Sequence, residues 1–297
     1  MHRYTEEQLG QYFDHIGYGH NARQLVSEDP LGFLTRLQRH HMARVPFENL
    51  GLHYSTHRTL SLDPEDLFEK IVLNGRGGYC MELNEFFAVV LRSIGFTLIS
   101  IGARVNGSRG WGGWNHQANL VTVDNKRYLV DVGFGSGTAP VPVPLEHDHE
   151  FDHIAPMRGR LQYRALEEHT DPNQRVWVYS LQETPDAPWK DQYAFTEIEF
   201  FAADYAIMNL NSSTSPASHF TQGVMCVRTI LDETKEQVIG RMILNKNYVK
   251  RRIRGEVEDL ETLENEKQRI KALEKYFGVL LSPREQRGIR GLVSELK

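Results

Sequence analysis

Cys80 stands where a reactive sulfur is plausible. It follows a glycine-rich turn at residues 74–79 and opens a segment of strong helical periodicity. A helix N-terminus carries partial positive charge and unpaired N–H groups, which favour a thiolate and a developing oxyanion. The glycines would let another molecule approach the backbone closely. We interpret Cys80 as a candidate nucleophile; the alternative is a small buried apolar residue, which free cysteines commonly are.

His116 and Asp131 are the candidate partners of this cysteine. A thiolate nucleophile works with a base, and the base needs an orienting group. The chain has 13 histidines, so position must identify the base. His116 enters the first of two strand-like runs, 117–123 and 128–134, and Asp131 lies in the second among apolar residues. An acid buried in such a strand needs a partner.

The loop between the two runs decides whether these side chains meet. A two-residue loop at Asp124 and Asn125 pairs Asp131 with Ala118 and leaves His116 on the same face, one diagonal step away. A loop shifted by one residue keeps the face but widens the gap, and a three-residue loop puts the side chains on opposite faces. The remaining alternative for Asp131 is a solvent-facing edge position.

Helical patterns precede these strands. Apolar residues recur at helical spacing behind capping or proline start signals, and the predicted helices span about residues 5–16, 30–45, 64–72 and 80–94. Further predicted elements are a strand at 97–105, a loop at 107–115, a connector at 139–156, two strands within 163–182, strands at 220–232 and 236–244, and a helix at 260–277. Helices followed by strands and then mixed structure favour an α+β fold over an alternating parallel sheet.

The composition is that of an ordinary globular chain. The 297 residues are 40% hydrophobic and 25% charged, with a net charge of −5, which gives no general reason to expect nucleic acid or an acidic membrane as partner. A basic run at 250–254 is interpreted as a strand end or turn, with anion binding as the alternative. Two cysteines, a polar N-terminus and no long apolar run predict a cytoplasmic protein without a signal peptide or membrane span.

Four ordered motifs carry a resemblance to one family. Their sequences are VPFENL at residues 45–50, RGGYC at 76–80, DVGFG at 131–135 behind His116, and TSP at 214–216. They are similar in sequence, order and separation to motifs of the arylamine N-acetyltransferases. The motifs run from about residue 44 to 220, and the predicted element order fits nearly the whole chain.

The resemblance implies a fold and a reaction. The expected fold is an N-terminal helical bundle (1–95), a central β-barrel (96–200) and a C-terminal α/β lid (201–297), with a core like that of papain-like cysteine enzymes. The expected reaction is ping-pong, with acetyl-CoA as co-substrate and no tightly bound cofactor. An arylamine, arylhydrazine or heterocyclic amine accepts the acetyl group, as in xenobiotic metabolism. Cys80 is then the nucleophile, His116 the base and Asp131 its orienter.

The resemblance also implies contacts around these three residues. Phe47 and Phe134 are expected to line the acceptor pocket, and Glu48 is expected to pair with Arg76. Four residues correspond to positions that approach CoA in the family: Arg109, Gly113, Thr214 and Ser215. The segment after Thr214 departs from hydroxyl-rich versions of the motif, because Ala217 and His219 replace possible donors. This departure puts CoA contacts there in doubt.

Other functions stay open at this point. The same scaffold suits a malonyl or propionyl donor, or amide closure on a biosynthetic thioester. A papain-like hydrolase shares the three residues but not the 45–50 segment, and a binding protein would not need all three. We predict no metal site, since the histidines at 147–153 lie in a proline-flanked connector. The sequence leaves monomer and dimer both open.

Overall fold

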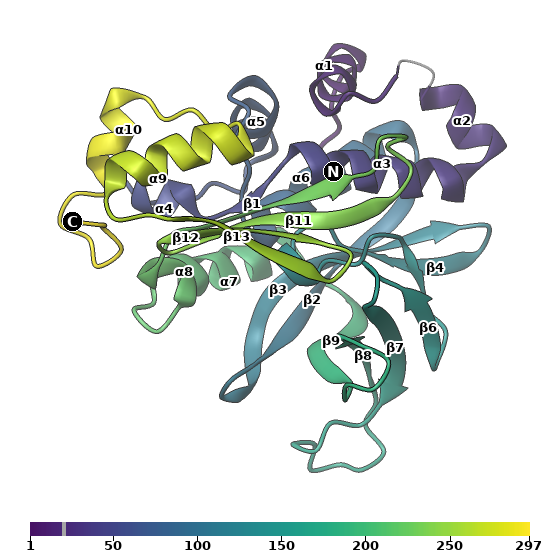
Figure 1. The fold of residues 1–297 in the computed structure, drawn as a ribbon. Helices are drawn as coiled ribbons and strands as arrows, with labels where there is room; N and C mark the ends of the chain where they lie inside the picture. Colours follow the sequence, from purple (N-terminus) through teal and green to yellow (C-terminus); the bar gives the residue numbers. More distant parts are fainter. Residues whose placement is uncertain (20–21) are drawn as a thin grey trace.

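The computed structural model describes residues 1–19 and 22–297, without the side chains of residues 22–24. The N-terminal third is helical (Figure 1). Its elements are α1 (Glu6–Ile16), α2 (Ala22–Glu28), α3 (Pro30–Arg44), α4 (Leu50–His53), α5 (Pro64–Phe68), the π-helical turn η1 (Glu69–Leu73) and α6 (Cys80–Ile94). The four helices predicted from periodicity are confirmed.

Local sequence accounts for these helix ends. Thr5 accepts a hydrogen bond from the Gln8 N–H and begins α1. Asp29 accepts from the Gly32 N–H, with proline at the first helical position of α3. Gly95 ends α6 at φ 115°, a conformation that glycine adopts without steric cost.

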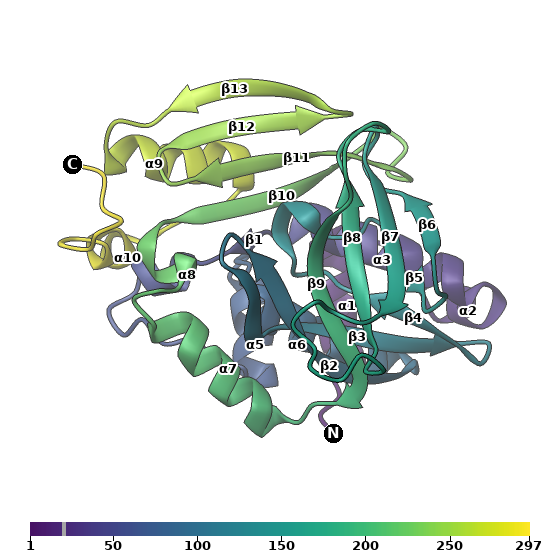
Figure 2. The same cartoon turned by 90° about the horizontal axis from the view of Figure 1, so that it is seen from below.

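Eight antiparallel strands form the central sheet, which curls into a nearly closed barrel (Figure 2). In spatial order they are β5 (Val143–Pro144), β4 (Lys126–Val130), β3 (Gly110–Val123), β2 (Thr97–Gly107), β9 (Lys190–Glu199), β8 (Val176–Gln182), β7 (Arg158–Arg164) and β6 (His149–Asp152). A short 3-10 turn, η2 (Gly135–Gly137), follows β4.

The prediction of a loop at 107–115 is wrong. Most of it continues β3, and the β2–β3 ladder reaches the Gly107–Gly110 pair. Two tryptophans stabilise this extension of β3. The Arg104 guanidinium carbon lies 4.2 Å from the centroid of the Trp114 ring, and Trp111 packs against a buried cluster of the barrel. Glycine content suggested a loop, but cross-strand packing overrode it.

A second, five-stranded sheet forms the C-terminal part. Its order is β1 (Phe47–Glu48), β10 (Met225–Leu231), β11 (Val238–Asn245), β12 (Tyr248–Ile253) and β13 (Glu256–Thr262). Helices accompany it: α7 (Ala202–Thr214), α8 (His219–Gln222), α9 (Glu266–Ala272), the π-helical turn η3 (Leu273–Phe277) and α10 (Pro283–Gly288). Strand β1 comes from the N-terminal third, so this sheet ties the two ends of the chain together.

Two boundaries in this part differ from prediction. The helix predicted at 260–277 starts only at Glu266, behind the Asn265 cap, and Leu260 belongs to β13. The strand predicted from Phe220 starts at Met225, because Phe220 lies in α8. At the first boundary Val257, Leu260 and Leu263 recur every third residue, which extends the helical pattern back into β13. At the second, Phe220 precedes the apolar residues of β10 without a break that periodicity could show. The run at 250–254 is strand and turn, as interpreted.

Helix α6 connects the bundle to the barrel. Its apolar face joins α1, α3 and strands β2–β4 in the largest buried cluster. This packing sets the N-terminal end of α6 against the β3–β4 hairpin. No helix in the described ranges has both the length and the apolar character that a membrane span requires.

Candidate active site

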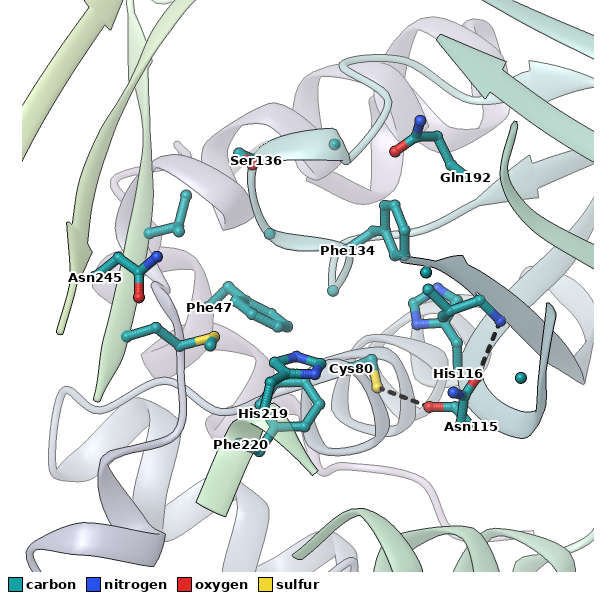
Figure 3. A pocket seen from close by; sticks show the side chains of 18 of the residues that line it. Phe47, Cys80, Asn115, His116, Phe134, Ser136, Gln192, His219, Phe220 and Asn245 are labelled. Atoms are coloured by element: carbon teal, nitrogen blue, oxygen red, sulfur yellow. Dashed lines mark hydrogen bonds between the residues drawn. The ribbon is translucent and has the colours of Figure 1, made fainter. Parts of the chain in front are cut away.

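Cys80 is the first residue of α6 and borders a cavity of about 1080 Å³ (Figure 3). The turn before it is fixed by Glu82, which accepts from the Tyr79 N–H at 3.1 Å and pairs with Lys70 at 2.5 Å. Cys80 is 3% exposed, and its sulfur lies 3.8 Å from the Asn115 carbonyl oxygen. The sulfur is therefore held at the wall of a cavity that a substrate can fill.

Glycines before Cys80 pack against the protein itself. A Cβ on Gly77 would lie 1.7 Å from the Pro46 carbonyl oxygen, and one on Gly78 would lie 2.7 Å from Glu82. This corrects the expectation that these glycines leave space for another molecule. Gly133 is also packed against the protein: a Cβ at this position would lie 2.8 Å from the Cys80 Cα, so the absence of a side chain lets this segment lie close to the start of α6.

The β3–β4 hairpin has the two-residue loop that the geometry requires. Asp124 and Asn125 have φ of 48° and 60°, as in a type I′ turn. Val123 pairs with Lys126, and the ladder continues to the Asn119–Val130 pair. The next step along this register sets residue 131 opposite residue 118, so the first of the three loop alternatives is confirmed.

His116 and Asp131 meet as this register predicts. The His116 Nε2 atom is 2.7 Å from Asp131 Oδ2, and both side chains are buried. Nδ1 is then the ring nitrogen left for the sulfur, and Cys80 contributes to the raised pKa of His116. His116 is thus hydrogen-bonded to Asp131 and lines the same cavity as Cys80.

The surroundings of His116 and Asp131 stabilise the charged form of both side chains. Burial alone lowers the pKa of His116, but the Asp131 carboxylate outweighs it and, with a smaller contribution from Cys80, raises this pKa from 6.5 to about 10. Burial alone would raise the pKa of Asp131; His116, the Asn84 amide and the Gly133 N–H together lower it. His116 therefore keeps its proton at neutral pH beside the sulfur, the protonation state of an ion-paired cysteine site.

Asn84 is a site residue that the sequence motifs did not reveal. Its amide donates to Asp131 Oδ1 at 2.9 Å and to the Gln117 carbonyl at 2.7 Å, and its oxygen accepts from the Val132 N–H at 3.0 Å. Asn84 is fully buried and lies one helical turn after Cys80. A polar residue four positions after the cysteine, on an apolar helix face, was the signal available in the sequence.

Two aromatic rings pack against the His116 imidazole. The Phe134 and Tyr193 centroids lie 5.1 Å and 5.0 Å from the imidazole, and 4.8 Å from each other. Phe47 and Phe220 contribute further apolar wall (Figure 3). Phe47 and Phe134, expected at the acceptor pocket, both line the cavity.

The four expected CoA positions divide into two pairs. Arg109 and Ser215 line the cavity, whereas Gly113 and Thr214 are outside its lining. The Thr214 hydroxyl instead donates to the Leu210 carbonyl at 2.6 Å, within α7. Sequence could not separate Thr214 from Ser215, because the chain direction at the end of α7 decides which side chain faces the cavity.

The expected pairing of Glu48 with Arg76 is present, at 3.7 Å between Oε1 and Nε. Arg76 has a closer partner in Glu285, at 2.6 Å, so the turn before Cys80 is also tied to α10. Within the residues that the structure describes, no group of three or more histidine, cysteine, aspartate or glutamate side chains could hold a metal ion.

The fold, with a candidate cysteine site at its cavity, is that of an N-acyltransferase, and comparisons identify the family. The N-acetyltransferase family model matches residues 30–286. This protein belongs to the arylamine N-acetyltransferase family. The M. marinum arylamine N-acetyltransferase, solved in complex with CoA, has a TM-score of 0.77 and 26% identity, covering 95% of this chain and 97% of that one.

Two curated relatives differ in their named acyl group. The N-malonyltransferase FDB2 of Fusarium pseudograminearum is 40% identical over 284 residues, covering 89% of this chain and 83% of its own. Human arylamine N-acetyltransferase 1 is 30% identical over 226 residues, covering 72% and 75%. The α+β fold with a papain-like core is confirmed, and the chain is an N-acyltransferase of this family.

Proposed function

We propose that this protein transfers a malonyl group from malonyl-CoA to the nitrogen of an aromatic amine through a thioester on Cys80. The 40% identity to an N-malonyltransferase carries the choice of donor, against 30% to an arylamine N-acetyltransferase. This replaces acetyl-CoA, the donor first expected from the family resemblance, by the alternative considered beside it.

In the first half-reaction the Cys80 sulfur attacks the thioester carbonyl carbon of the acyl-CoA. The C–S bond to CoA breaks, and His116 gives its proton to the departing thiolate. Asp131 keeps the imidazole oriented, with Nε2 held at 2.7 Å and Nδ1 toward the sulfur. Free CoA leaves, and the acyl group stays on Cys80.

In the second half-reaction an amine nitrogen attacks the Cys80 thioester. His116, now neutral, takes the proton that the nitrogen loses, and Cys80 leaves as the thiolate. An amide is released and the starting protonation state returns. Splitting one acyl transfer into two steps lowers the barrier of each.

The cavity suits these substrates. Its volume of about 1080 Å³ exceeds what a small amine alone fills, so it has room for the acyl arm of CoA as well. The rings of Phe47, Phe134 and Phe220 offer an apolar surface for an aromatic amine. Arg109 and Ser215 at the same cavity are candidate CoA contacts.

Both cysteines are free thiols, which supports action in a reducing compartment such as the cytoplasm. We propose small-molecule partners only, an acyl-CoA and an amine, in the detoxification of foreign amines. No further partner enters the reaction.

Intact-mass measurement tests the proposal directly. The protein is incubated separately with malonyl-CoA, acetyl-CoA and propionyl-CoA, and the rate of adduct formation on Cys80 is followed. We expect the malonyl adduct to form fastest and to disappear when an aromatic amine is added. Faster acetylation would return the donor to acetyl-CoA, and absence of any adduct would overturn acyl transfer altogether.

A further inference from the structure

Arg241 is a buried arginine at the cavity. On β11 it alternates with Met242 and Leu244, which belong to the core of the C-terminal sheet, so its side chain is on the opposite face. Arg241 lines the same cavity as Cys80 and is 2% exposed. From this face Asn245 points to the cavity as well (Figure 3).

Among the residues that the structure describes, Arg241 has no anionic partner. Its Nη2 donates to the Thr138 carbonyl at 2.9 Å and its Nη1 to the Gly240 carbonyl at 3.4 Å, while Nε has no partner. No aspartate or glutamate within the described ranges forms an ion pair with it. Burial lowers the pKa of Arg241 to about 10, so the guanidinium stays charged at neutral pH. An uncompensated buried charge is costly.

A second arginine increases this cost. Arg252 on β12 is directly opposite Arg241, lines the cavity and is half-buried. Like charges directly opposite each other destabilise a sheet. The other basic residues of β12 have acidic partners on β13: Lys250 pairs with Asp259 at 3.1 Å and Arg251 with Glu258 at 2.5 Å. Arg252 faces Val257 instead.

Two titratable groups beside Arg241, His153 and Tyr179, supply no negative charge. Glu183, an acid in the cavity lining, pairs with Lys190 at 3.3 Å. His153 contacts the same Thr138 carbonyl at 3.0 Å, and burial with the nearby Arg241 lowers its pKa to about 3, so it is neutral. Burial raises the pKa of Tyr179 far above its usual range, so its hydroxyl keeps its proton. The positive charge at this wall is therefore left for something that enters the cavity.

The wall connects to the reacting groups through one short loop. The Phe134 N–H donates to the Thr138 hydroxyl at 2.9 Å, and Phe134 packs on His116. The carbonyl that anchors Arg241 is thus four residues along the chain from the ring that covers the imidazole. An anion at Arg241 shares the cavity with an acyl group on Cys80.

We propose that Arg241, with Arg252 beside it, forms the subsite for the carboxylate of the malonyl group. The inference rests on the proposed function and assigns the choice of acyl group to named residues. A malonyl thioester carries a carboxylate beyond the reacting carbonyl, whereas an acetyl thioester ends in a methyl group. Only the malonyl group carries a negative charge that compensates the arginine charge. The planar guanidinium group can also donate two parallel hydrogen bonds to a carboxylate.

The test compares Arg241→Met with Arg251→Met as the matched control. Arg251 is exposed, its side chain is on the other face of the sheet, and it pairs with Glu258. Four donors are used: malonyl-CoA, acetyl-CoA, and the malonyl and acetyl thioesters of N-acetylcysteamine, which carry no phosphate. The rate of Cys80 acylation is measured by intact mass under single-turnover conditions.

We expect Arg241→Met to slow malonylation about 10- to 100-fold, as for loss of a charged hydrogen bond, and acetylation less than about threefold. The same selectivity should appear with both carriers, and Arg251→Met should match the parent. Equal losses for both acyl groups would overturn the proposal. Loss confined to the CoA donors would assign the arginine to a CoA phosphate and overturn the carboxylate subsite.

Three further outcomes keep the test decisive. If Arg241→Met fails to fold, by its thermal transition, Arg252→Met replaces it: a selective loss of malonylation, smaller than expected for Arg241, supports the subsite, and unchanged selectivity overturns it. If the parent itself is not malonylated, the proposed donor fails. If the parent is malonylated and Arg241→Met is equally fast, only the subsite fails.

Discussion

The two cysteines of this protein are both buried, yet their surroundings differ in kind. Cys80 is 3% exposed and Cys226 is fully buried, so exposure hardly separates them. Cys226 lies in β10 within an apolar cluster, and burial raises the pKa of its thiol well above the usual value. Cys80 instead begins a helix and borders the same cavity as the protonated imidazole of His116. A charged partner and an open cavity, rather than exposure, distinguish a reactive sulfur from a structural one.

The strongest test of this difference removes one sulfur. Cys80→Ala should abolish the acyl adduct and reduce turnover on the order of 10⁵-fold, as for loss of a catalytic nucleophile. The measurement is intact mass with each acyl-CoA, followed by amine turnover. A remaining adduct on this variant would assign the nucleophile to another residue.

Removing the negative charge of Asp131 should lower the reactivity of Cys80 toward that expected for Cys226. Asp131→Asn should lower kcat by about 10³- to 10⁴-fold, because the imidazole loses its orienting charge. Alkylation by iodoacetamide near neutral pH should slow with it. Turnover within tenfold of the parent would contradict the role of Asp131.

Asn84 tests the same comparison indirectly, because it hydrogen-bonds to Asp131 and not to His116 or Cys80. Asn84→Ala removes one of the two donors to Asp131 Oδ1, which keeps the Gly133 N–H at 2.8 Å, and leaves the buried Val132 N–H without its partner. This should lower the free energy of unfolding by about 1–3 kcal/mol. As a positioning residue, it should affect kcat more than KM. Urea unfolding and steady-state kinetics measure the two effects; a change in KM alone would contradict this assignment.

The raised pKa of His116 has consequences for Cys80 and for stability. This pKa is raised from 6.5 to about 10, so the imidazolium beside Cys80 persists through neutral pH, and iodoacetamide at pH 7 should alkylate Cys80 faster than it alkylates a free small thiol measured beside it. The same shift contributes stability that is complete below pH 6.5 and lost as pH rises through about 10, which urea unfolding across this range measures. A rate no faster than that of the free thiol would argue against the ion pair.

The smallest expected effect comes from the other sulfur. Cys226→Ala should keep acylation and turnover within about twofold of the parent. It should lower the free energy of unfolding by about 1 kcal/mol, typical of a small cavity in a core. Loss of acylation in this variant, with the fold intact by its thermal transition, would give Cys226 a role at the site.

Particular elements show how far prediction from sequence reached. The start of α6 was predictable, because turn residues and periodicity are local signals, and the two-residue β3–β4 loop was one of three alternatives, between which only the structure decided. The extent of β3 and the start of α9 were not predictable, because packing with distant strands decides where such elements begin and end.

The sequence by itself singled out Cys80 as the nucleophile candidate, with His116 and Asp131 as its candidate partners, and limited the hairpin to a few loop registers, one of which lets His116 meet Asp131. The candidates follow from residue types, and the possible registers follow from backbone geometry within the hairpin. Only the tertiary structure decided that Asn84 supports Asp131 and that Arg241 is buried at the cavity without an anionic partner. Such facts depend on which distant segments meet, and a buried charge is defined by what the fold packs around it.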